Sequence, residues 1–152
     1  MKKKLAHTEP PISKISLAKT PTQIARCHEV MRELRPQFQR RDRFVKRVRL
    51  QQRDGYFLAF LEAEGEVRAV AGYRILESLF SGRCMYVDDL VTRAMDRSAG
   101  YGGKLLEWLT ERARALGCEN FELDSGVQRF DAHRFYFRKR MRISAYHFAM
   151  KL

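Results

Sequence analysis

Apolar and polar residues alternate along several short stretches of this chain, and such alternation is typical of β-strands. Residues 56–63 and 66–76 are rich in β-branched and aromatic side chains, and Glu64-Gly65 between them predicts a tight hairpin turn. A turn at Ser81-Gly82 leads into a further predicted strand. The complete set of predicted strands is 15–18, 56–63, 66–76, 83–92, 120–124 and 143–151.

Other stretches repeat apolar residues every three or four positions, which predicts helices. Thr20-Pro21-Thr22 favours a helix start, the apolar spacing continues from Ile24 to Leu34, and Pro36 ends it. Further helices are predicted over residues 41–52, from Lys104 to a glycine stop at Leu116-Gly117, and over residues 129–139. Strands and helices mixed in this order predict an α/β (α+β) domain over residues 15–152, preceded by a mobile tail over residues 1–14.

The most informative stretch is residues 86–116, where a strand, a glycine loop and a helix follow one another. Gly100, Gly102 and Gly103 precede the helix that begins near Lys104. The first turn of a helix has four backbone N–H groups without partners and carries partial positive charge, and glycine lets an anion approach them. The stretch therefore predicts a phosphate-binding loop.

Two familiar phosphate motifs do not fit this loop. A Walker loop needs Ser or Thr after Gly103-Lys104, and a dinucleotide fingerprint needs a third glycine; Leu105 stands at both positions. The spacing Arg97-x-x-Gly100-x-Gly102 instead resembles the motif of the GCN5-related N-acetyltransferases, the GNAT family. Residues 132–136 likewise resemble the Ala-x-x-x-Tyr segment of that family. The resemblance covers residues 66–152 well and the earlier part of the chain only in outline.

The resemblance implies a mixed central sheet flanked by helices and an enzyme that moves an acetyl group from acetyl-CoA directly to a primary amine. It implies that loop amides hold the pyrophosphate of CoA and that a strand splayed from its neighbour offers backbone groups to the pantetheine arm. The cofactor-binding residues implied in this way are Leu90, Val91, Thr92, Arg97, Ser98, Ala99, Gly100, Tyr101, Gly102 and Gly103. No metal site is predicted.

For the chemistry, the resemblance assigns Tyr136 as the acid that protonates the leaving thiolate. The base that takes the ammonium proton stays open between Asp124, Asp89 with its neighbour Asp88, and a chain of waters. His133 is expected to face solvent or to hydrogen-bond locally. Arg140-Met141 departs from the Gly-Phe that the family often has after the tyrosine, where glycine would allow a tight turn from helix to strand.

Charge is unevenly placed along the chain, which has a net charge of +12. Residues 1–53 hold 15 basic and 4 acidic residues, whereas residues 54–152 hold 15 and 14. The basic helix predicted at 41–52 is interpreted either as a solvated face or as a basic lip over the acceptor side. The basic charge therefore leaves an acetyltransferase for RNA-borne amines as one alternative. Because the base is not identified, an acyl-CoA-binding module without turnover is another alternative.

The three cysteines, Cys27, Cys84 and Cys118, lie far apart and show no metal-ligand spacing. They are interpreted as reduced thiols in a cytoplasmic protein without a membrane segment. The expected partners are acetyl-CoA and an amine acceptor that the sequence does not identify. A homodimer stays open, and nucleic acid is kept only as the alternative partner given above.

Overall fold

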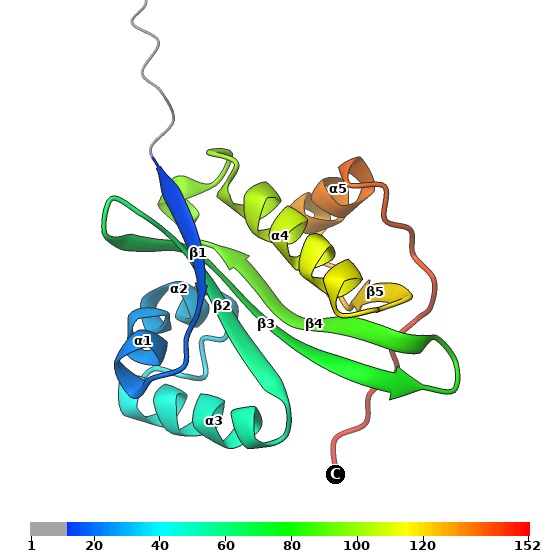
Figure 1. Ribbon diagram of the computed structural model, residues 1–152, viewed down its shortest axis with the longest axis horizontal. Helices are drawn as coiled ribbons and strands as arrows, with labels where there is room; N and C mark the ends of the chain where they lie inside the picture. The colour runs from blue at the N-terminus through cyan, green and yellow to red at the C-terminus, as the bar shows by residue number, and fades with distance from the viewer. Residues whose placement is uncertain (1–11) are drawn as a thin grey trace, which may run out of the picture.

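A computed structural model describes residues 12–152, which form a five-stranded sheet with helices on both faces (Figure 1). The strand order is β1-β2-β3-β4-β5; the first four strands are antiparallel, and β5 runs parallel to β4. The strands are β1 (Ser13–Leu17), β2 (Tyr56–Ala63), β3 (Glu66–Ser78), β4 (Gly82–Thr92) and β5 (Asn120–Leu123). The helices are α1 (Pro21–Arg26), α2 (His28–Leu34), α3 (Arg41–Arg53), the short 3-10 helix η1 (Ala94–Asp96), α4 (Tyr101–Ala115) and α5 (Phe130–Arg138).

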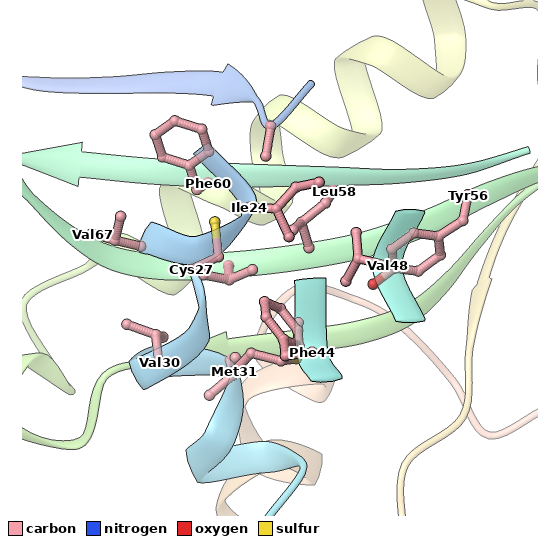
Figure 2. Packing of buried hydrophobic residues seen from close by; sticks show 13 residues of the cluster. Ile24, Cys27, Val30, Met31, Phe44, Val48, Tyr56, Leu58, Phe60 and Val67 are labelled. Atoms are coloured by element: carbon pink, nitrogen blue, oxygen red, sulfur yellow. The ribbon is translucent and has the colours of Figure 1, made fainter. Parts of the chain in front are cut away.

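Helices α1, α2 and α3 cover one face of the sheet. Leu58 and Phe60 of β2 point toward these helices because alternate residues of a strand face opposite sides. Figure 2 shows them against Ile24, Cys27 and Phe44 in one buried cluster. Burial of these apolar side chains holds the three helices to the sheet.

Helix α4 covers the opposite face of the sheet. Its residues Leu105 and Leu109 are fully buried against Ala59 and Leu61, the β2 residues that alternate with those of the first cluster. Leu105 and Leu109 are one helical turn apart, so they lie on one side of α4. The sheet thus separates two hydrophobic clusters, and α4 is held with its N-terminus beside the end of β4 (Figure 1).

Local signals in the sequence are confirmed at several boundaries. Glu64 and Gly65 both have positive φ, 54° and 78°, as a two-residue hairpin turn of type I′ requires. Gly117 ends α4 with a φ of 72°. Thr20 caps α1 by accepting from the amide of Gln23 at 3.2 Å, but the helix predicted from Thr20 to Pro36 is divided at Cys27 into α1 and α2.

The strand predicted over residues 143–151 is not formed, and this prediction was wrong. Residues 141–152 have no regular secondary structure, and within residues 12–152 the backbone of residues 142–152 makes no hydrogen bond to other backbone. Arg140, which stands where glycine was expected, adopts a φ of 62° in the turn after α5. Alternation of apolar residues favours a strand only when a neighbouring strand supplies hydrogen bonds, and none is in register here.

At the other end of the chain, β1 begins at Ser13, two residues earlier than predicted. The rest of the expected tail, residues 1–11, lies outside the described residues.

Candidate active site

The glycine loop leads into α4 with several backbone amides that have no acceptor in the described part of the chain. Gly100 is the N-cap of the helix and has a φ of 86°, a backbone conformation that residues with a Cβ rarely adopt. Within residues 12–152 no acceptor is found for five amides at this helix start, those of Ser98, Gly100, Tyr101, Gly102 and Gly103. A Cβ on Gly102 would lie 2.8 Å from the hydroxyl of Thr92, so glycine also lets the helix start approach β4.

Strands β4 and β5 separate next to this loop. They pair only from Cys84 to Val87 on β4, opposite Asn120 to Leu123 on β5. Residues 89–92 of β4 pair with β3 on one side, and residues 88–92 have no partner on the other side among the described strands. The predicted backbone groups of Leu90, Val91 and Thr92 therefore lie along a gap in the sheet that runs toward the glycine loop.

Cationic side chains flank the helix start. The Lys139 ammonium lies 3.4 Å from the position that a Cβ on Gly103 would occupy, and it forms an ion pair with Glu107 at 2.7 Å. Arg97, the predicted flanking residue, is largely exposed and lies 3.8 Å from Glu33. From the sequence, Lys139 was only one of several basic residues in a predicted turn. Its position beside α4 is seen only in the tertiary structure.

A cavity of about 580 Å³ opens on the other side of the sheet gap. Its walls come from α2, the loop after it, α3, the middle of β4, the segment after β5 and His147. Asp88, Asp89 and Asp124 all line this cavity, so the structure brings the predicted carboxylates together. Tyr136 is not among the residues that line it.

Asp89 is held firmly in the wall of the cavity. Arg35 donates from Nε to Oδ1 of Asp89 at 2.7 Å, and the Tyr56 hydroxyl donates to Oδ2 at 2.8 Å. The Asp89 side chain is 12% exposed. Burial and the neighbouring carboxylate raise the pKa of Tyr56, so its hydroxyl remains a donor. Both oxygens of Asp89 are thus engaged by the protein.

Asp88 is the extra residue of a β-bulge in β4. Tyr73 of β3 pairs with Val87 and Gly72 pairs with Asp89, which leaves Asp88 without an opposite residue. Its carboxylate accepts two hydrogen bonds from Arg74, at 2.7 and 2.9 Å. Bulges re-aim side chains at the edge of a site, and this one places consecutive carboxylates in the same wall.

Asp124 has a different environment, at the end of β5. Its Oδ2 accepts from the Tyr86 hydroxyl at 2.6 Å and lies 2.9 Å from Nδ1 of His147. Burial, followed by the hydrogen bond to Asp124, raises the pKa of Tyr86. The Asp124 side chain is 51% exposed, and no protein partner is found for Oδ1 among the described residues. Asp124 therefore presents a free carboxylate oxygen to the cavity.

His147 is a site residue that the sequence did not indicate. It lay in a predicted strand, and only the tertiary structure places its ring against Asp124, 23 positions earlier. His133, by contrast, hydrogen-bonds locally to the carbonyl of Gly126 at 2.9 Å, as expected. Next to Asp124, the hydroxyl of Ser125 is shielded from solvent and has no partner in the described part of the chain.

Tyr136 lies on α5, which is joined to α4 by the Lys139–Glu107 ion pair. Its ring packs edge-on against Phe135, and its hydroxyl has no hydrogen-bond partner within residues 12–152. Burial raises the pKa of Tyr136. The hydroxyl is therefore protonated at neutral pH and available as a donor.

The cysteines take no part in this arrangement. Burial raises the pKa of Cys27 to about 12 and that of Cys84 to about 11, so both remain thiols at neutral pH. Among residues 12–152, no group of three side chains of the metal-binding types is placed to hold a metal ion. No helix in the same range is long and apolar enough to cross a bilayer.

Comparison with known proteins decides the family. The model of the Acetyltransferase (GNAT) family matches residues 24–141. The chain belongs to the GNAT family of acetyltransferases. It is an N-acetyltransferase, and its reaction transfers an acetyl group to an amine.

Individual relatives agree with this assignment. The uncharacterized N-acetyltransferase YhdJ of Bacillus subtilis is 36% identical over 112 residues, which cover 74% of this chain and 79% of YhdJ. The aminoalkylphosphonate N-acetyltransferase of Salmonella typhimurium is 38% identical over 66 residues, 43% of each chain. A GNAT family acetyltransferase from Staphylococcus aureus has the same fold, with a TM-score of 0.76 at 19% identity, covering 92% of this chain and 98% of that acetyltransferase. The predicted GNAT fold is therefore confirmed.

Proposed function

We propose that this GNAT enzyme takes its acetyl group from acetyl-CoA, held at the start of α4, and transfers it to a primary amine bound in the cavity. The observation that carries this proposal is the set of five free amides at a left-handed glycine N-cap, next to the gap between β4 and β5. Free amides at a helix start bind phosphate groups, and unpaired strand backbone binds an extended amide-containing chain.

The residues present fit this cofactor along its length. The amides of residues 98–103, with the cations of Arg97 and Lys139 nearby, suit the pyrophosphate. The open edge of β4 at Leu90, Val91 and Thr92 suits the pantetheine arm. Acetyl-CoA supplies an activated thioester, so the protein's main task is to hold both reactants in one orientation.

His147 and Asp124 are the groups we assign to the acceptor amine. The Oδ1 of Asp124, which has no partner among residues 12–152, attracts the ammonium group, and the contact of Nδ1 of His147 with Oδ2 orients the His147 ring. Imidazole is the side chain best suited to exchange protons near neutral pH, so His147 is the proton acceptor in this proposal. Asp89, whose oxygens are both engaged by Arg35 and Tyr56, is a positioning residue.

Tyr136 is the proposed proton donor. Its protonated hydroxyl, free of protein partners in the described chain, supplies a proton to the sulfur of the departing thiolate. It lies on the α4 side of the sheet gap, whereas Asp124 and His147 lie on the cavity side. Two proton-handling groups on opposite sides of the gap suit a reaction that removes a proton from one reactant and adds one to the other.

The acceptor class follows from charges in the cavity wall. Arg47 lines the cavity and makes no ion pair within residues 12–152. An acceptor that carries an anionic group as well as its amine would pair with both Arg47 and Asp124. Aminoalkylphosphonates, named as the substrates of one relative, carry both an amine and an anionic group, so they are the first acceptors to be tested.

We place the reaction in the cytoplasm, since the three cysteines are free thiols.

Calorimetric titration with acetyl-CoA tests the binding site, and α4 offers a matched control. Gly100 and Gly117 flank the two ends of this helix, both have positive φ, and nothing lies within 4 Å of a Cβ at either position. Gly100→Glu and Gly117→Glu therefore carry similar backbone strain and the same added charge. We expect wild type and Gly117→Glu to bind acetyl-CoA with micromolar affinity and Gly100→Glu to lose binding; retained binding by Gly100→Glu overturns the assignment.

Turnover is measured by release of the CoA thiol with a panel of amines: aminoalkylphosphonates, amino acids, uncharged primary amines, peptides and a short RNA. Acetylation of an amine in the panel is the expected result. Binding of acetyl-CoA without turnover on every amine would support the alternative of a binding module. Acetylation of the RNA alone, with a steep dependence on salt, would support the nucleic-acid alternative.

A further inference from the structure

The segment between β4 and the helix start of α4, residues 93–99, is held in place by side chains from other elements. It contains η1 and runs directly into the glycine loop. The amides of Asp96, Arg97 and Ala99 donate to carbonyls within the segment, at 2.9, 3.3 and 3.2 Å. These local bonds shape the turn. Its position against the sheet depends on side-chain contacts with the elements around it.

Asp96 makes the first of these contacts. Its Oδ2 accepts from Nε of Arg93 at 2.5 Å, and its Oδ1 accepts from a terminal nitrogen of Arg68 at 3.3 Å. The side chains of Asp96 and Arg68 are only 14% and 12% exposed. A carboxylate largely removed from water is stable when charged donors engage it, so the position of Asp96 depends on that of Arg68.

Arg68 lies on β3, close to the turn of the β2–β3 hairpin, and is fixed there by several acceptors. Its Nε donates to the carbonyl of Ala63 at 3.3 Å, and its terminal nitrogens lie 3.1 Å from carboxylate oxygens of Glu64 and Glu66. Glu66 also accepts from Arg93 at 2.9 Å. A guanidinium group is planar and has five donors, so one arginine can join several acceptors in fixed directions. Arg68 thus connects the hairpin turn to η1.

Helix α2 makes a second contact with the segment. The Glu33 carboxylate accepts from the amide of Ala94 at 2.8 Å and lies 3.8 Å from Arg97, the cation that flanks the proposed cofactor site. The segment before the glycine loop is therefore held from two separate elements, the β2–β3 hairpin and α2.

The backbone that these contacts support is strained. Ser98 has a φ of 70°, a value that is uncommon for a residue with a Cβ. Strained backbone persists where the surrounding structure holds it, and it is concentrated at functional sites. Ser98 also carries one of the amides for which no acceptor is found within residues 12–152.

We propose that Arg68 is a positioning residue for the glycine loop. Through Asp96 it holds residues 93–99 in the conformation that keeps the amides of residues 98–103 available to a pyrophosphate. The identity of this ligand rests on the proposed function, whereas the hold on the loop does not. A loop that is already ordered loses less conformational freedom when it binds, so Arg68 should contribute to acetyl-CoA affinity and not to the chemical step.

Arg68→Gln and Arg26→Gln form a matched pair for the test. Both arginines bind the β2–β3 hairpin, and Arg26 does so through Glu62 at 2.6 Å and the carbonyl of Gly65 at 3.1 Å. Among the described residues, Arg68 contacts η1 and Arg26 does not. Asp96→Asn is a second variant, because it weakens the same contact and leaves Arg68 with its partners in the hairpin.

Hydrogen exchange of the protein without ligand measures the hold on the loop. The amides of Asp96, Arg97 and Ala99 should exchange at least 10-fold faster in Arg68→Gln and in Asp96→Asn, relative to the middle of α4, and should be unchanged in Arg26→Gln. Calorimetric titration should show acetyl-CoA affinity about 10-fold lower in the first two variants. With an accepted amine, KM for acetyl-CoA should rise by the same factor while kcat stays unchanged.

The double variant tests the route of the effect. If Arg68 acts through Asp96, the losses of affinity in Arg68→Gln and Asp96→Asn should not add. Fully additive losses would overturn this route, and so would equal losses in Arg68→Gln and Arg26→Gln. Unchanged exchange of the three loop amides in both Arg68→Gln and Asp96→Asn would overturn the proposal altogether. Failure of the proposed function looks different, since the wild type would then bind no acetyl-CoA while the exchange comparison still decides the role of Arg68.

Discussion

The hydroxyl of Tyr56 on β2 donates a hydrogen bond to the carboxylate of Asp89 on β4, 33 positions later, at 2.8 Å. Strand β3 lies between these two strands, and the phenol ring crosses it at Gly72. A Cβ at residue 72 would overlap that ring. Glycine on the central strand is therefore what allows a residue of β2 to orient a carboxylate in the cavity wall.

Replacement of this glycine tests the relationship. Gly72→Ala should lower the free energy of unfolding by about 1–3 kcal/mol or more, because the added methyl group displaces the Tyr56 ring from a well-packed site. Urea unfolding of Gly72→Ala, Tyr56→Ala and the double variant gives the coupling between the two positions. The second substitution should cost much less once the first is present; strictly additive costs would contradict the steric account.

The two candidate carboxylates should respond differently to the same neutral substitution. Asp124→Asn should reduce kcat by about 100-fold with little loss of stability, because Asp124 is half-exposed and orients the proposed base. Asp89→Asn should lower the free energy of unfolding by about 1–3 kcal/mol, since the amide carries no charge and has a single acceptor oxygen for the two donors Arg35 and Tyr56. The same variant should reduce kcat much less.

Steady-state kinetics and urea unfolding of both variants check this difference. His147→Gln serves as a companion and should follow Asp124→Asn in kcat. If Asp89→Asn proves to be the variant with the larger loss of kcat and unchanged stability, the assignments of the two carboxylates are reversed.

Tyr136 makes a prediction about alkaline pH. Burial raises its pKa above the ordinary value of 10.0, so its hydroxyl keeps the proton through the neutral and mildly alkaline range and loses it only above that value. As a proton donor it therefore supports turnover up to about pH 10, and the tyrosine causes no decline below it. Tyr136→Phe should lower kcat by about 100-fold with unchanged acetyl-CoA affinity.

The pH profile of kcat in wild type and Tyr136→Phe checks this expectation. An alkaline decline well below pH 10 that disappears in the phenylalanine variant would show a lowered pKa instead. An equal kcat in both proteins would remove the tyrosine from the mechanism.

Lys139 should strengthen cofactor binding through its position at the start of α4. Lys139→Gln removes a cation next to Gly103, and we expect acetyl-CoA affinity to fall by about 3–10-fold, in a manner that added salt diminishes. Calorimetric titration at two salt concentrations is the measurement. Arg142→Gln, in the same basic stretch but without an ion pair in the described chain, is the control. Equal losses in both variants would indicate a general effect of net charge.

Much of the fold was predictable because its signals are local. The hairpin at Glu64-Gly65, the glycine stop at Gly117 and the apolar spacing of α3 and α4 each depend on neighbours within a few residues. The strand over residues 143–151 was predicted incorrectly for the complementary reason. Its alternation of apolar residues is genuine, but a strand also requires a partner strand, and whether one lies alongside is not a local property.

The sequence by itself determined the order of elements up to α5, apart from the division of the first predicted helix at Cys27. It also determined the glycine loop at the start of α4 and the family resemblance, since these depend on adjacent residues. Only the tertiary structure decided how the carboxylates differ. It engages both oxygens of Asp89 with Arg35 and Tyr56, leaves Oδ1 of Asp124 without a partner among residues 12–152, and brings His147 against Oδ2 of Asp124. Those contacts join residues 23 to 54 positions apart in the sequence, and the tertiary fold brings them together rather than any local pattern.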